Sequence, residues 1–117
     1  MKKKLLFVTI SFLLSNCEAI FLEDISNESV VLLAPSDNSE VTSGTIEFHW
    51  EQLNDTIEYK IQISAPSFSA ASQIVLDSIT TATSLSKELA AGEYEWRVKA
   101  FNSDYSTNYS ANSFTVN

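Results

Sequence analysis

Three segments of the chain, residues 45–51, 56–64 and 93–100, alternate strictly between apolar and polar residues. Successive side chains of a β-strand point to opposite faces of its sheet, whereas a helix would scatter both sets around its axis. The alternation therefore predicts three strands, each with one buried face and one face toward water. The predicted inward set comprises Ile46, Phe48, Trp50, Ile57, Tyr59, Ile61, Ile63, Tyr94, Trp96, Val98 and Ala100.

Less regular apolar runs predict further strands near residues 30–34, 73–78, 84–88 and 109–116. Segments rich in Ser, Asp, Asn or Gly separate the strands, as is typical of turns. Beyond the N-terminal apolar run, no stretch has the pattern of a long amphipathic helix. Short strands at this spacing predict an all-β fold, an immunoglobulin-like antiparallel β-sandwich of about seven strands.

Several stretches of this pattern carry a resemblance to a known family. "IEFHW", "IEYKIQIS", "LAAGEYEWRVKAFNS" and "YSANSFTV" resemble the fibronectin type III-like domains of bacterial surface proteins, and the resemblance spans residues 29–117. It implies a sandwich of fibronectin type III type whose structural core includes Trp50, Tyr59, Leu89 and Tyr94, with Trp96 on the same inward face. Tyr94 matches the tyrosine corner, in which a buried phenol bonds to a nearby turn. Leu89 stands one residue closer to Tyr94 than is usual, which bears on that hydrogen bond and not on the fold.

The N-terminus has the layout of an export signal. Lys2, Lys3 and Lys4 precede an apolar run over residues 5–14, and Ser15 and Asn16 lead from it into Cys17, the only cysteine. As a helix these ten residues, of which only Thr9 and Ser11 are polar, would span roughly 15 Å, about half of a hydrocarbon core, which disfavours a membrane span.

The four residues Leu14, Ser15, Asn16 and Cys17 resemble the lipobox of bacterial lipoproteins, with Asn16 where the strict motif has glycine or alanine. The resemblance implies cleavage before Cys17 and acylation of its thiol. A plain cleaved secretion signal and an uncleaved anchor are the alternatives.

These features predict three parts: a lipoprotein signal peptide at residues 1–16, a lipidated tether at 17–28 and the fibronectin type III-like domain at 29–117. The expected location is the bacterial cell envelope, at the outer membrane and outside the cytoplasm. The lipid at Cys17 is the expected link to the membrane.

Charge narrows the range of partners. The whole chain carries a formal net charge of −8, and loss of the first sixteen residues would leave four basic residues against fifteen acidic ones, or −11. Such a chain repels phosphate backbones, so we expect no nucleic acid partner.

The sequence holds little that suggests catalysis or metal binding. Its only histidine, His49, falls on the predicted solvent side of a strand, where an ordinary surface residue is favoured over a catalytic base. The loop of Asp37, Asn38, Ser39 and Glu40 lacks the spaced ligands of a calcium loop. Glu93 and Glu95 continue into Arg97 and Lys99 on one face, and we interpret that face as paired across strands with Glu58 and Lys60. We expect neither an enzyme nor a bound cofactor or metal.

Aromatic residues off the core face are candidates for stacking against sugar rings. Phe101, Tyr105 and Tyr109 surround the loop at residues 102–108, and Phe68 is a further candidate. The alternative interpretation is that Phe101 and Tyr109 complete the core and that Tyr105 is an isolated surface ring.

The sequence thus predicts a non-catalytic, membrane-anchored lipoprotein that presents its sandwich for protein binding or assembly, with another cell-envelope protein as partner. Loops and open strand edges are the natural contact surfaces of such a fold. The alternative is a carbohydrate-binding accessory lipoprotein with a glycan ligand at Tyr105 and Tyr109.

Overall fold

The computed structural model describes residues 23–54, 57–71 and 73–117, which form strands and loops and contain no helix. Among these residues, therefore, no helix is long and apolar enough to cross a membrane. Eight strands occur in the order β1 (Leu32–Ala34), β2 (Ser39–Val41), β3 (Gly44–Trp50), β4 (Glu58–Ala65), β5 (Gln73–Thr80), β6 (Ser84–Leu89), β7 (Gly92–Phe101) and β8 (Ser110–Val116).

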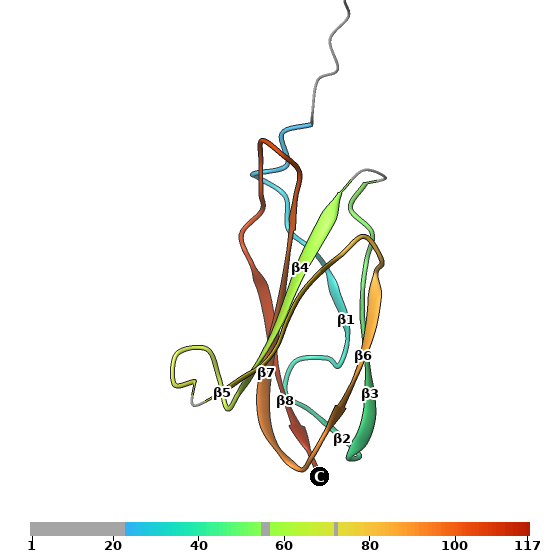
Figure 1. The fold of residues 1–117 in the computed structure, drawn as a ribbon, viewed down its shortest axis with the longest axis vertical. Coiled ribbons are helices and arrows are strands. Elements are labelled where there is room, and N and C mark those ends of the chain that lie inside the picture. Colours follow the sequence, from blue (N-terminus) through green and yellow to red (C-terminus); the bar gives the residue numbers. More distant parts are fainter. Residues whose placement is uncertain (1–22, 55–56, 72) are drawn as a thin grey trace, which may run out of the picture.

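The strands form two sheets that face each other as a sandwich (Figure 1). One sheet has the strand order β1-β3-β6 and the other the order β2-β8-β7-β4-β5. The expected all-β sandwich is confirmed, and all eleven side chains predicted to point inward are buried. Aromatic rings join the layers: Phe48 meets Trp96 edge to face at 5.1 Å between ring centroids, and Trp50 meets Tyr59 at 5.8 Å.

Strand β2 was not predicted from the sequence, where its residues belong to a polar stretch. Strand β2 pairs in parallel with β8, so this strand pair departs from the expected antiparallel arrangement. Asn38, with a φ of 62°, turns the chain into this strand, and its N–H donates to the Ser113 carbonyl at 2.7 Å. Three residues are too few to show an alternating pattern, and their pairing partner lies more than seventy positions away along the chain.

The hydrogen bond of the tyrosine corner is present despite its short spacing. The Tyr94 hydroxyl donates to the Ala90 carbonyl at 2.8 Å, and the Tyr94 ring stacks on Phe114. Leu89 is buried beside them. The turn continues through Gly92, whose φ of 156° is a conformation that residues with a side chain rarely adopt.

The segment before β1 packs onto the sandwich. We expected residues 17–28 to be a tether, but within that range Ile25 is fully buried in the core. Glu23 accepts a hydrogen bond at its carbonyl from Asn102, and the Ser26 hydroxyl and N–H both donate to Asp24, which lowers the pKa of that carboxyl group. The expected signal peptide, Cys17 and the rest of the tether lie outside the described residues.

The two ends of the sandwich differ in what they present. The described N-terminal segment, in blue, lies at the same end as the connection between β7 and β8 (Figure 1). The C-terminus lies at the opposite end. The loop of residues 102–109, which carries two of the three predicted ligand contacts, is therefore next to the segment that leads back to Cys17.

Candidate functional site

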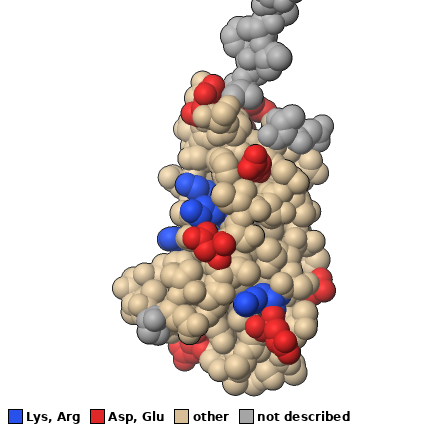
Figure 2. All heavy atoms as spheres, viewed as in Figure 1, with Lys and Arg blue, Asp and Glu red and all other residues tan. Residues whose placement is uncertain are grey.

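The outer face of the five-stranded sheet gathers most of the positive charge. After residue 22 the chain has four basic residues, and three of them, Lys60, Arg97 and Lys99, lie on β4 and β7. The fourth, Lys87, belongs to β6 in the other sheet. Figure 2 shows this cluster in blue on a surface whose other charges are mostly red.

The predicted cross-strand pairing of charges on this face is wrong. In the register of β4 and β7, Lys60 lies directly opposite Lys99, Glu58 opposite Phe101, and Glu95 opposite Ser64. The inward-facing residues explain this register, because a slip by one position would turn every buried side chain toward water. The interaction between surface charges is too weak to oppose that burial.

Arg97 organises the middle of the face. Its guanidinium lies 3.9 Å from the ring centre of Phe68 and 4.1 Å from that of Tyr109, and its Nε and Nη2 donate to Gln62 Oε1 at 2.9 and 2.7 Å. A guanidinium between two rings forms a cation–π contact with each. The Phe68 N–H also donates to Glu95 Oε1 at 2.8 Å, which holds the loop after β4 against the sheet.

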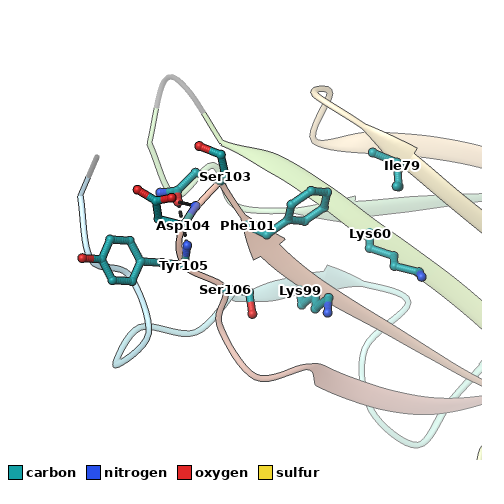
Figure 3. Close-up of a pocket in the computed structure, with 9 residues that line it drawn as sticks. Lys60, Ile79, Lys99, Phe101, Ser103, Asp104, Tyr105 and Ser106 are labelled. Atoms are coloured by element: carbon teal, nitrogen blue, oxygen red, sulfur yellow. Dashed lines mark hydrogen bonds between the residues drawn. The ribbon is translucent and has the colours of Figure 1, made fainter. Parts of the chain in front are cut away.

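A hollow of about 410 Å³ opens beside this cluster (Figure 3). Its lining comprises Lys60, Ile79, Lys99, Phe101, Asn102, Ser103, Asp104, Tyr105 and Ser106. In the close-up, Phe101 lies between Lys60 and Lys99 on one side and Ser103, Asp104 and Tyr105 on the other. The hollow is a shallow depression that is open to solvent, not an enclosed cavity.

Two of the three predicted ligand contacts, Phe101 and Tyr105, meet in this hollow. Tyr105 is 37% exposed, whereas Phe101 is half-buried. Tyr109 does not line the hollow, and Arg97 covers one face of its ring. Phe68 is likewise covered by Arg97.

The loop that carries Tyr105 is held in shape by Asn102. The Asn102 Oδ1 accepts hydrogen bonds from the N–H groups of Asp104 and Tyr105 at 3.0 and 2.9 Å, and its Nδ2 donates to the Glu23 carbonyl at 3.1 Å. Thr107 closes the loop, because its Oγ1 accepts from the Ala100 N–H at 3.0 Å. One wall of the hollow is thus held in place by three hydrogen bonds of the Asn102 side chain.

The two lysines of the hollow are unequally neutralised. Lys60 Nζ lies 3.8 Å from Asp77 Oδ1, whereas Lys99 forms no ion pair with any described residue, and its Nζ lies 5.2 Å from the Tyr109 ring centre. Like charges directly opposite on neighbouring strands destabilise a sheet. Neither lysine, nor Ile79, was identified as a site residue from the sequence, because only strand pairing brings them together.

The residues that the sequence analysis weighed for catalysis or metal binding lie at the surface. His49 Nε2 lies 3.5 Å from Glu47 Oε1, with nearly half of the histidine side chain exposed. Asp37 accepts from the Ser113 N–H and Glu40 from Asn117 Nδ2. The described residues contain no group of three or more histidine, cysteine or acidic side chains that could hold a metal ion.

Strand β5 is an open edge of the five-stranded sheet. It pairs with β4 alone in the sheet order. Ile74 and Ile79 on this strand are 50% and 57% exposed. The register shifts near the start of β5, so that the regular part of the edge runs from Leu76 to Thr80.

Solved structures share this fold. No protein-family model matches the chain, and no curated protein matches it in sequence. A fibronectin type III domain derived from the human KIAA0970 protein matches with a TM-score of 0.56 at 16% identity, over 75% of this chain and 72% of that one. The FN1-FN3 domains of chicken CNTN1 match with a TM-score of 0.50 at 17% identity, over 75% of this chain and 35% of that one. The chain is therefore a fibronectin type III-like domain in fold.

Proposed function

We propose that this protein is a non-catalytic bacterial lipoprotein, anchored at Cys17, that binds another protein of the cell envelope through the edge strand β5. The observation that supports the docking surface is the open edge itself, with Ile74 and Ile79 exposed on it. An unpaired strand offers a row of backbone donors and acceptors to an incoming strand, and exposed apolar side chains add contact area.

The lipid anchor is supported by the lipobox-like residues before Cys17, and the chain that follows them limits how far an anchored domain could lie from the membrane. Because Ile25 is buried in the core, the residues left to link the lipid to the domain run only from Cys17 to Glu23. Fully extended, they reach roughly 20 Å. An anchored domain is thus kept close to the membrane, with its edge strand presented to neighbouring envelope proteins.

Fatty acid labelling tests the anchor. Cells that express the protein are grown with a labelled fatty acid, and the label is expected on the parent chain and absent from the variant Cys17→Ser. The variant should also leave the membrane fraction. Label retained by Cys17→Ser, or absent from both proteins, rejects the anchor.

The docking surface is tested separately by a matched pair of substitutions. Ile74→Lys places a charge on the β5 edge, and Leu33→Lys places one on β1 in the other sheet, at a residue that is also 50% exposed. A photo-reactive residue at position 78 is expected to form a discrete cross-linked species in cells. This species should disappear with Ile74→Lys and persist with Leu33→Lys. If both substitutions abolish it or neither does, β5 is not the docking surface.

A second function, binding of a carbohydrate, is supported by the hollow in which Phe101 and Tyr105 meet. Aromatic rings offer flat apolar surfaces for the faces of sugars, and the serine hydroxyls of the loop add hydrogen-bonding groups. Glycan-array binding that is lost with Tyr105→Ala would support this function, and an array without signal for the parent protein would reject it.

A further inference from the structure

We infer that the hollow selects sugars that carry a negative charge, with Lys60 and Lys99 binding the anionic group. This inference rests on the second function proposed above and specifies its ligand class. It follows from the way in which charge, shape and hydrogen-bonding groups are distributed along the hollow.

The first argument is the position of the two lysines. They are direct partners in the register of β4 and β7, on the face that also lines the hollow. In the unliganded sheet the two side chains lean apart, with Lys60 Nζ 3.8 Å from Asp77 Oδ1 on β5 and Lys99 Nζ 5.2 Å from the Tyr109 ring centre next to β8. Both lysines line the hollow, and their flexible side chains allow the two ammonium groups to converge on one anionic group bound there.

The second argument is the sign of the surrounding surface. With a net charge of −11 after residue 16 the chain as a whole repels anions, whereas Lys60, Arg97 and Lys99 gather positive charge on one face. Arg97 is already engaged by Gln62 and two rings. Lys60 and Lys99 line the hollow and Arg97 does not, so they are the two cations of this face that a ligand in the hollow would meet.

The third argument is the order in which charged, apolar and polar side chains follow one another along the hollow. Phe101 separates the lysines from the loop with Ser103, Asp104 and Tyr105 (Figure 3). A ligand with its anionic group at the lysines would set an apolar ring face near Phe101 and direct hydroxyl groups toward the loop. Asp104 at the loop end would accept hydrogen bonds from hydroxyl groups and repel a second anion. A sugar with one charged group matches this order.

Binding measurements with four probes test the inference on the purified full-length chain in non-ionic detergent. The probes are glucuronate, glucose 6-phosphate, glucose and inorganic phosphate. At least one charged sugar is expected to bind about tenfold more tightly than glucose, which corresponds to the contribution of a charge-assisted contact. The two charged sugars show whether a carboxylate or a phosphate fits the lysines better.

Substitutions assign the effect to the two lysines. Lys60→Gln and Lys99→Gln should each abolish the preference for the charged sugar, whereas the control Lys87→Gln, on the other sheet, should leave it unchanged. Salt should weaken the binding of the charged sugar and leave that of glucose unaffected.

Each of the other outcomes overturns the inference and shows which part of it is wrong. Equal binding of charged and neutral sugars removes the role of the lysines and leaves carbohydrate binding intact. Inorganic phosphate that binds as tightly as glucose 6-phosphate shows that the rings contribute nothing. If none of the sugars binds, the inference and the second function fail together. The docking surface on β5 is untouched by any of these results.

Discussion

Single side chains determine how the two ends of the sandwich are closed. The Tyr94 hydroxyl closes the turn before β7 by its bond to the Ala90 carbonyl, and Asn102 closes the loop after β7 through three hydrogen bonds. Both side chains satisfy backbone groups that no strand partner could reach. The Tyr94 bond is partly buried and the Asn102 bonds are exposed, so each contributes on the order of 1 kcal/mol or less.

Tyr94→Phe isolates the contribution of the corner bond. The substitution leaves the ring on Phe114 and removes the hydroxyl, so we expect a loss of about 1 kcal/mol in the free energy of unfolding with the fold unchanged. Chemical denaturation measures it. Tyr105→Phe is the control, because the Tyr105 hydroxyl forms no hydrogen bond with a described residue, and its unfolding free energy should match that of the parent. Equal stabilities for all three proteins would contradict the role of the corner.

At the scale of elements, the segment before β1 belongs to the folded unit. Ile25 is fully buried and Val30 is 3% exposed, although neither lies in a strand. Glu23 is also held by Asn102 across the loop after β7. The segment from Glu23 to Val31, called the strap below, therefore links the start of the domain to the loop that lines the hollow.

Ile25→Ala tests whether this strap stabilises the domain. Truncation of a fully buried isoleucine leaves a cavity, and we expect a loss of about 2–5 kcal/mol in the free energy of unfolding. The matched control is Ile74→Ala, which truncates a half-exposed isoleucine on β5 and should change stability by less than about 0.5 kcal/mol. Similar losses in the two variants would show that residues 23–28 do not share the core.

At the scale of the whole molecule, the proposed anchor and the strap together predict an orientation. The strap begins beside the loop after β7, and the C-terminus lies at the other end of the sandwich (Figure 1). With roughly 20 Å of chain between Cys17 and Glu23, the end that carries the loop should face the bilayer. The hollow then opens near the membrane surface, while β5 runs along the side of the molecule.

Fluorescence quenching at the membrane surface checks this orientation. A dye attached through Ser103→Cys, in the loop after β7, should be quenched strongly by a quencher placed on lipid headgroups in reconstituted vesicles. The same dye attached through Asn117→Cys, at the far end, should be quenched weakly. The reverse order would contradict the orientation, and a flexible linker inserted after Cys17 should make the two positions equal.

Some properties of the protein follow from the sequence because they are local. Alternation along Thr45 to Glu51 already identifies which side chains of β3 are buried, since a strand turns successive residues to opposite faces. The tyrosine of the corner and the aromatic residues beside the loop after β7 could also be named from their positions. Each of these conclusions needs only the order of residues within one segment.

Other properties depend on which segments become neighbours, and here tertiary structure decides. Lys60 and Lys99 are thirty-nine positions apart, and each has the pattern of an ordinary surface residue. They face each other only because burial of the inward side chains sets the register of β4 and β7. The parallel strand β2 and the buried Ile25 arise in the same way, from partners far along the chain. The sequence by itself determined the all-β class, the inward faces of the alternating strands and the net charge, because these are local or additive properties. Tertiary structure decided which surface groups became neighbours and which residues outside the alternating strands joined the core, because both depend on contacts between distant segments.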